Sequence, residues 1–229
     1  MSRGAFITFE GSEGCGKSTQ VLRLAARLEQ AGVRVLITRE PGGTAIGEKI
    51  RDLLQFAPES FAMTPETELL LFEASRSQLV RELIRPALEQ GTAVISDRFF
   101  DSTTVYQGVA RKLAPEIVAT LNSFAVGSDR PDLTIILDVD VTTARARMLR
   151  RVRPVAVVDR MEQEPIEFYE RVCEAYRALA RSEPDRFTLI NGVQTPDEIE
   201  KEIWDAVTSR LSAFAVFKKS EIGNRKSKK

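Results

Sequence analysis

Five short runs of apolar, β-branched and aromatic residues recur along the chain, and none alternates like a strand with one wet face. The runs cover residues 5–9, 33–38, 93–96, 133–137 and 187–190. Strands buried on both faces have this pattern, which is typical of parallel sheets covered by helices. The sequence therefore predicts five strands inside a parallel sheet.

Apolar residues recur at helical spacing between these runs. In residues 17–31, Val21, Leu24 and Leu28 share one face, and Gly32 is a typical helix stop. Further helical patterns cover residues 65–90, 115–126, 142–151, 165–180 and 196–217. Strands that alternate with helices predict an α/β fold with right-handed crossovers and helices on both faces of the sheet.

The chain of 229 residues shows no internal repeat and no low-complexity linker before its C-terminal end. We expect one domain over residues 1–217, with a mobile lid at about residues 147–160. Residues 218–229 hold six basic residues and one acidic residue, whereas the whole chain is neutral, with 33 of each sign. The body is therefore acidic, which argues against a nucleic-acid-binding surface. The tail is expected to be disordered.

Composition excludes several kinds of chemistry. Without a histidine there is no catalytic His, no Ser-His or Cys-His pair and no His metal site. Cys15 and Cys173 cannot form a disulfide scaffold. No signal-peptide pattern opens the chain, and no apolar run approaches the roughly 20 residues that cross a bilayer. We expect a soluble, cytoplasmic protein that does not bind membranes.

Residues 11–19 carry the motif GxxxxGK[ST] between a predicted strand and a predicted helix. Its glycines let backbone N–H groups point at phosphate oxygens, and the helix that follows adds its positive end. Lys17 suits the β- and γ-phosphates, and the Ser18 hydroxyl suits Mg²⁺. The motif predicts binding of a nucleoside triphosphate by Gly11, Ser12, Glu13, Gly14, Cys15, Gly16, Lys17, Ser18 and Thr19.

Charged residues also follow the second and third predicted strands. The carboxyl ends of parallel strands form the ligand crevice, so Arg39 and Arg98 are expected in one site, where two guanidinium groups suit a second phosphate. Salt bridges from these arginines to Glu40 or Asp101 are the alternative. Asp97 suits a Mg²⁺ partner or, alternatively, a helix N-cap.

Two further sets of residues suit a nucleotide acceptor. Phe72 and Arg76 lie one helical turn apart, where an aromatic ring can stack on a base and an arginine can bond its edge; Phe72 as a core residue is the alternative. Arg150, Arg151 and Arg153 precede residues 154–158, and a lid arginine there would neutralise charge during phosphoryl transfer. A solvated basic helix face is the alternative for these arginines.

The motifs together resemble the bacterial thymidylate kinases, which phosphorylate dTMP to dTDP with ATP and Mg²⁺. The matching segments occur in the family's order and the resemblance extends from residue 5 to about 211. They are FEGSEGCGKST at 9–19, TREPGGT at 38–44, LLFEASRSQ at 70–78, DRF at 97–99 with Ser102, Tyr106 and Gln107, and DRMEQE at 159–164.

This resemblance implies a P-loop NTPase fold, a homodimer and a dTMP site. In that site Arg39 and Arg98 bind the phosphate, Phe72 stacks on thymine and Arg76 bonds a thymine carbonyl. Tyr106 packs under the deoxyribose. The full implied substrate-binding set is Arg39, Glu40, Phe72, Arg76, Arg98, Ser102, Thr103, Tyr106 and Gln107.

The phosphate loop has no arginine, so the chain resembles the members whose catalytic arginine lies in the lid. Lys17, Arg98, Arg150, Arg151 and Arg153 are then the catalytic candidates. Three departures from the family pattern, Phe99, Val105 and Asn191, remove no phosphate-binding group.

The expected reaction is in-line transfer of the ATP γ-phosphoryl group to dTMP during dTTP synthesis. A phosphate acceptor is mostly a dianion at pH 7 and needs no general base. One alternative is a deoxynucleoside kinase with Glu40 as base, although a neutral acceptor would leave two cations unpaired. Another is a P-loop ATPase or switch module, which would leave the acceptor-side residues unexplained.

Overall fold

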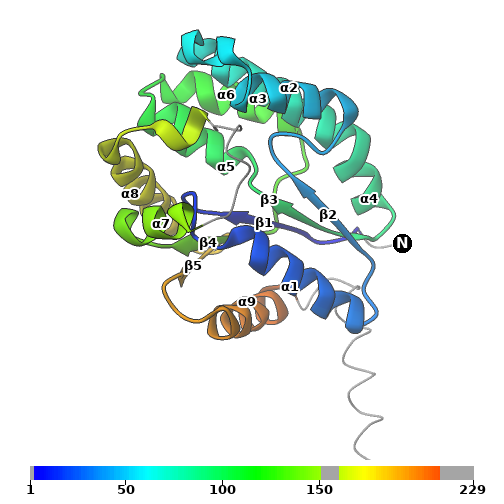
Figure 1. Cartoon of the computed structure of the whole chain (residues 1–229). Coiled ribbons are helices and arrows are strands. Elements are labelled where there is room, and N and C mark those ends of the chain that lie inside the picture. Colours follow the sequence, from blue (N-terminus) through cyan, green and yellow to red (C-terminus); the bar gives the residue numbers. More distant parts are fainter. Residues whose placement is uncertain (1–2, 151–159, 212–229) are drawn as a thin grey trace, which may run out of the picture.

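Five parallel strands form a sheet with the order β2-β3-β1-β4-β5 at the centre of the computed structural model, which describes residues 3–150 and 160–211 (Figure 1). Phe9 pairs with Asp97 and Ile135, and Arg39 pairs with Asp97. The carboxyl ends of neighbouring strands therefore meet at one edge. The strands are β1 (Phe6–Glu10), β2 (Val35–Arg39), β3 (Ala93–Asp97), β4 (Leu133–Asp138) and β5 (Phe187–Asn191).

The five predicted strands are confirmed, but the expected burial on both faces holds only for the central three. β1, β3 and β4 are buried along nearly their whole length, whereas Ile37 of β2 and Leu189 of β5 are about two-fifths exposed. β2 and β5 are the edge strands, and the covering helices pack mainly over the middle of the sheet. An apolar run alone does not tell an edge strand from a central one.

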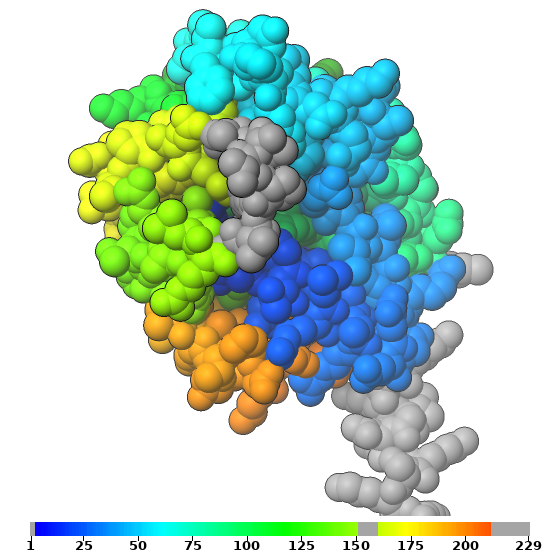
Figure 2. All heavy atoms as spheres, in the orientation of Figure 1, coloured from blue at the N-terminus to red at the C-terminus, as the bar shows by residue number. Residues whose placement is uncertain are grey.

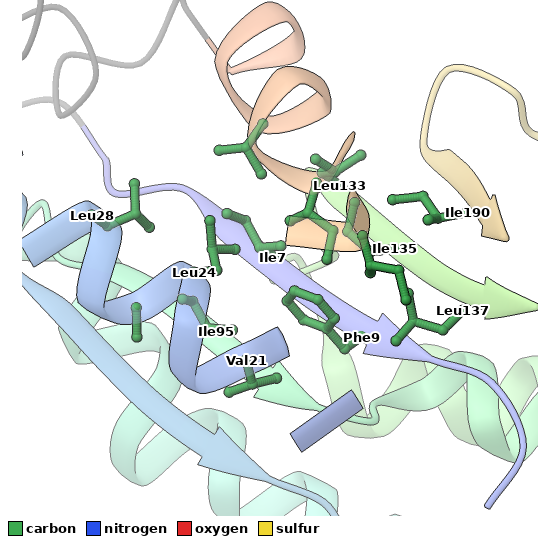
Figure 3. Close-up of a cluster of buried hydrophobic side chains, with 14 of the residues drawn as sticks. Ile7, Phe9, Val21, Leu24, Leu28, Ile95, Leu133, Ile135, Leu137 and Ile190 are labelled. Carbon is green, nitrogen blue, oxygen red and sulfur yellow. The ribbon is translucent and has the colours of Figure 1, made fainter. Parts of the chain in front are cut away.

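Helices cover both faces of the sheet (Figure 1). α1 (Lys17–Gln30) and α9 (Pro196–Arg210) pack on one face, where Ile7 and Phe9 of β1 contact the α1 side chains Val21, Leu24 and Leu28 (Figure 3). The other face carries α3 (Pro65–Leu79), α4 (Arg85–Glu89), α6 (Pro115–Val126) and α8 (Ile166–Ser182). The side chain of Phe6 points to this second face and packs edge-on against Phe99.

The long helix predicted over residues 65–90 is present but contains a π-helical turn, η2 (Val80–Ile84), between α3 and α4. Pro86 lies just after this turn. Proline lacks an N–H group and its ring crowds the preceding turn, so a wider turn lets the helix continue past it.

Several elements near the cavity were not predicted from the pattern. They are α2 (Ala45–Gln55), the 3-10 turn η1 (Pro58–Ala62), α5 (Phe100–Thr103) and the π-helical turn η3 (Thr104–Ala110). The start of α2 has a local signal, because the Thr44 side chain accepts a hydrogen bond from the Gly47 amide. α7 (Val141–Leu149) and the 3-10 turn η4 (Arg160–Gln163) complete the described elements. Within residues 3–150 and 160–211, no helix is long and apolar enough to span a bilayer.

Candidate active site

The glycine-rich loop after β1 has a backbone shape that side chains would prevent. Gly11 and Gly14 have φ angles of 131° and 78°, and a Cβ atom at these positions would lie 2.6 Å from the Leu137 carbonyl oxygen and 2.4 Å from that of Ala144. α1 begins at Lys17 directly after Gly16, which has no side chain to cap its first N–H groups. The loop therefore presents backbone donors and a helix N-terminus to an anion.

Lys17 lies over this loop. The Lys17 Nζ atom donates to the carbonyl oxygens of Gly11 and Ser12 at 3.0 and 2.9 Å. Lys17 is buried, with 7% of its surface exposed. Ser18 follows with its Oγ atom 2.6 Å from Asp97 Oδ2 at the end of β3. Asp97 does not cap α5, because Phe99 occupies the N-cap position. A hydroxyl and a carboxylate oxygen side by side are the ligand type that Mg²⁺ prefers.

A cavity of about 220 Å³ joins the loop to the ends of β2 and β3. Figure 2 shows this side of the molecule, with α7 (yellow-green) on one side of the loop and α2 (light blue) on the other. Most of the predicted site residues line the cavity, namely Glu13, Gly14, Gly16, Lys17, Ser18, Arg39, Glu40, Phe72, Asp97, Arg98, Ser102, Thr103, Tyr106 and Gln107. Gly11, Ser12, Cys15, Thr19 and Arg76 do not line it.

Arg98 crosses the cavity from β3 to the phosphate loop. Its guanidinium donates to Glu13 Oε1 at 2.6 Å and to Ser102 Oγ at 3.0 Å. The alternative partner, Asp101, instead forms two hydrogen bonds with Arg186. Arg98 therefore faces the cavity with its charge balanced by a loop carboxylate.

Arg39 reaches the same cavity from β2. Its side chain is 52% exposed and bonds Glu48 at 2.8 Å, so the alternative pairing with Glu40 is absent. An exposed ion pair of this kind is weak. Arg39 can therefore turn toward an anionic ligand at little cost.

Glu40 and Arg76 form a buried pair beside the cavity. Arg76 is 1% exposed and donates from Nε to Glu40 Oε2 at 2.8 Å, and its Nη2 atom lies 2.6 Å from the same oxygen. It also donates to Glu73 at 2.9 Å, and to Asn122 and Thr103 at 3.1 and 3.0 Å. Burial raises the pKa of Glu40 to about 7, against the opposing effect of Arg76. The predicted bond from Arg76 to a base stays a prediction, because its guanidinium is turned to these side chains.

The wall after α5 holds the remaining acceptor-side residues. Tyr106 donates its hydroxyl proton to Glu13 Oε2 at 2.8 Å and packs edge-on against Phe168. Gln107 donates from Nε2 to Glu68 at 2.7 Å. Glu13 thus holds both Arg98 and Tyr106 across the cavity.

The predicted lid arginines are only partly covered by the structure. Arg151 and Arg153 lie outside the described residues, and Arg150 is exposed at the end of α7. Arg147, one turn earlier, donates to the Gly192 carbonyl oxygen at 2.8 Å. The Arg147 side chain is therefore bonded to the segment that follows β5.

Sequence reasoning missed several residues of the site. Arg51 and Gln55, one turn apart on α2, line the cavity. Met161 and Glu162 of η4 line it as well and belong to the DRMEQE segment that the sequence singled out. The signal that could have indicated Arg51 and Gln55 is their spacing of four residues, which places them on one face of a helix. Glu10 lies beneath the site and accepts hydrogen bonds from Ser102, Tyr176 and the Phe99 amide at 2.6, 2.7 and 2.8 Å. Burial raises the pKa of Glu10, opposed chiefly by Arg98.

Comparisons with known proteins agree on one family. The family model described as thymidylate kinase matches residues 9–203. A thymidylate kinase from Geobacter sulfurreducens is 48% identical over 210 residues, which are 91% of this chain and 98% of that protein. One from Deinococcus radiodurans is 44% identical over 210 residues, which are 92% of this chain and 99% of that protein. The crystal structure of a thymidylate kinase from Ehrlichia chaffeensis aligns with a TM-score of 0.72 at 34% identity, covering 90% of this chain and 99% of that one.

Proposed function

The chain belongs to the thymidylate kinase family and phosphorylates dTMP with ATP in dTTP synthesis, and from this premise we propose how its own residues carry out the reaction. Its fold is the P-loop NTPase fold of that family. The observation that carries the proposal is that one cavity holds both Lys17 of the phosphate loop and Arg98 of the acceptor wall. The acceptor wall is the set of cavity-lining residues Arg39, Glu40, Phe72, Arg98, Ser102, Thr103, Tyr106 and Gln107. A donor phosphate and an acceptor phosphate bound by Lys17 and Arg98 meet in this cavity.

The phosphate loop binds ATP. Its N–H groups and Lys17 hold the β- and γ-phosphates, because Lys17 lies over the loop and lines the cavity beside Gly14 and Gly16. Ser18 and Asp97, whose oxygens lie 2.6 Å apart, would hold Mg²⁺, a cation that prefers oxygen ligands of these types. When bound there, Mg²⁺ neutralises charge on the transferring phosphoryl group.

The acceptor wall binds dTMP. Arg98 and Arg39 hold its phosphate, and Arg98 exchanges the carboxylate of Glu13 for the phosphate oxygens. Phe72, Thr103 and Gln107 contact the base, Tyr106 supports the sugar, and Glu40 and Ser102 complete the wall. Arg76, turned to Glu40 and Thr103, reaches the base edge only by giving up part of these bonds.

Charge neutralisation by cations of the site stabilises the transition state of phosphoryl transfer. The dTMP phosphate is mostly a dianion at pH 7, so no residue has to remove a proton. Lys17 and Arg98 are already in the cavity, and the lid supplies a further cation from Arg150, Arg151 or Arg153. Positioning and electrostatic stabilisation are the main sources of rate in phosphoryl transfer.

We also propose that the protein is a cytoplasmic homodimer with one catalytic domain over residues 1–217. Phe124 and Ile117 on α6 are 75% and 57% exposed, and Leu70 on the adjoining α3 is 56% exposed. A patch of large apolar side chains on two packed helices suits an interface between two copies. The family model ends at residue 203, so the basic residues of 218–229 lie outside the matched region, which supports a separate basic tail there.

An ADP-release assay with a panel of acceptors tests the proposed acceptor site. We expect dTMP to have the highest kcat/KM among dTMP, dCMP, AMP and GMP, and thymidine to be inactive because it lacks the phosphate that Arg39 and Arg98 bind. Turnover of thymidine at the rate of dTMP would show that these arginines do not hold an acceptor phosphate. ADP release without any acceptor would instead favour an ATPase.

A further inference from the structure

The carboxylate of Glu68 joins three segments of the chain behind the acceptor wall. It is 1% exposed and accepts hydrogen bonds from Gln107 Nε2 at 2.7 Å, from Arg111 at 3.2 and 3.3 Å, and from Arg160. Glu68 comes from α3, Gln107 from η3, Arg111 directly follows η3, and Arg160 begins η4. One buried anion with two cations and one amide is a fully paired arrangement.

The segments held by Glu68 form part of the cavity wall, although Glu68 itself does not line it. Gln107 lines the cavity directly, and η4 brings Met161 and Glu162 to it. Arg160 also donates to the Leu54 carbonyl oxygen of α2 at 3.3 Å, which fixes the start of η4 on a second side. The position of this wall therefore depends on the Glu68 carboxylate.

Glu68 also decides which way the Gln107 amide points. The Glu68 carboxylate is held ionised by its partners: its burial is outweighed by Arg111, Gln107 and Arg160, and its pKa is lowered. An ionised carboxylate accepts hydrogen bonds and donates none. It therefore binds the NH₂ group of Gln107 and leaves the carbonyl oxygen Oε1 for a ligand. An acceptor in the wall suits the N3–H donor of thymine and opposes the N3 acceptor of cytosine.

We propose that Glu68 is a positioning residue that sets base selectivity, because it fixes the Gln107 amide with its oxygen toward the acceptor base. This inference rests on the proposed placement of dTMP beside Gln107. A Gln side chain at position 68 would donate as well as accept, so it would let the Gln107 amide turn over and present its NH₂ group. Selection of thymine over cytosine would then weaken.

The surroundings of Glu68 favour a folded variant. A second cavity of about 310 Å³ borders Glu68, Arg111 and Arg160 and shares no lining residue with the active-site cavity. Water can enter a polar space of that size and bond the cations when the carboxylate is replaced. Arg111 also keeps Glu164 as a partner at 2.6 Å.

The experiment compares Glu68→Gln with the wild-type enzyme in calorimetric titrations with dTMP and dCMP. We expect the ratio of the two Kd values to fall by about tenfold or more, because a site that bonds a base edge loses most of its discrimination when that bond can reverse. Glu68→Asp still only accepts hydrogen bonds and should keep the ratio within about threefold. Asp129→Asn is the matched control, because Asp129 is a buried carboxylate bonded to Arg85 at 2.7 Å outside the cavity lining, and it should leave the ratio unchanged.

An unchanged ratio in folded Glu68→Gln, or a ratio lost equally in Glu68→Asp, would overturn the inference. Gln107→Leu separates this from the proposed function: it should lower the ratio by itself, and an unchanged ratio there would mean that dTMP does not lie beside Gln107. If circular dichroism shows that Glu68→Gln is unfolded, the other two variants decide. The inference then requires a lowered ratio in Gln107→Leu and a retained ratio in Glu68→Asp, and the opposite result in either rejects it.

Discussion

At the scale of single residues, Arg98 shows a conflict between backbone preference and function. Its φ angle is +69°, a region that residues other than glycine, asparagine and aspartate rarely occupy. The Arg98 amide bonds the Phe9 carbonyl oxygen at 2.9 Å, and the Ser96 hydroxyl bonds the Arg98 carbonyl oxygen at 2.7 Å. The surrounding structure thus holds a strained backbone that points a guanidinium into the cavity.

Replacing Arg98 by alanine should lower kcat/KM for dTMP by roughly 100-fold or more, because it removes a largely buried cation that binds the acceptor phosphate. Steady-state kinetics checks this. Arg39→Ala is the comparison, since the Arg39 side chain is 52% exposed and should matter less. Near-normal constants in Arg98→Ala would assign Arg98 a structural role.

The buried Glu40 carboxyl should make stability depend on pH. Burial raises its pKa to about 7, whereas the unfolded chain releases the proton near the usual 4.5. Between these pH values the native state holds more protons than the unfolded state, so the free energy of unfolding falls as pH rises and levels off above about 7.

Urea unfolding of the wild-type protein and Glu40→Gln between pH 5 and 8 measures this effect. The stability of the wild type relative to the variant should fall with pH by up to about 3 kcal/mol. A difference that does not change with pH would show that Glu40 titrates alike in both states.

At the scale of elements, the division between phosphate loop and lid explains where a catalytic arginine is needed. The loop supplies Lys17 and backbone donors but no arginine. α7 ends at Leu149, within the predicted lid of about residues 147–160, and Arg147 is bonded to the Gly192 carbonyl oxygen. The arginines after α7 are the ones whose sequence position lets them follow the transferred group.

We expect at least one of the single variants Arg150→Ala, Arg151→Ala and Arg153→Ala to lower kcat by roughly 100-fold, with KM values changed only a few-fold. That pattern marks an interaction made mainly in the transition state. Arg147→Ala is the matched control and should keep near-wild-type kcat. Three fully active variants would mean that no single lid arginine is essential.

At the scale of the whole molecule, the large apolar side chains of α3 and α6 set the expected oligomeric state. Phe124 is 75% exposed, so Phe124→Asp changes little packing within the described chain but places a charge in the proposed interface. Size-exclusion chromatography with light scattering should give the mass of two chains for the wild type and of one chain for the variant. Leu22→Asp on α1, where the side chain is 62% exposed on the opposite face of the sheet, should remain dimeric. A wild-type protein with the mass of one chain would contradict the homodimer.

Local pattern alone determined the five strands, the phosphate loop and most of the helices. The loop motif is contiguous, and its glycines, Lys17 and Ser18 act within a few residues of one another. Buried strands and amphipathic helices also leave periodic signals in short windows. The acceptor-side residues Arg39, Asp97 and Arg98 could be placed together because parallel strands end at one edge of the sheet.

Only the tertiary structure decided which side chains pair across that edge. Glu13 from the loop, not Asp101, balances Arg98, and Arg76 turns to Glu40, Asn122 and Thr103, which lie far from it in the sequence. The exposure of β2 and β5 depends on how far the covering helices extend. The hydrogen bonds to Glu68 depend on three segments of the chain meeting at its carboxylate. Pairings of this kind are set by packing between distant segments, so no pattern of neighbouring residues records them.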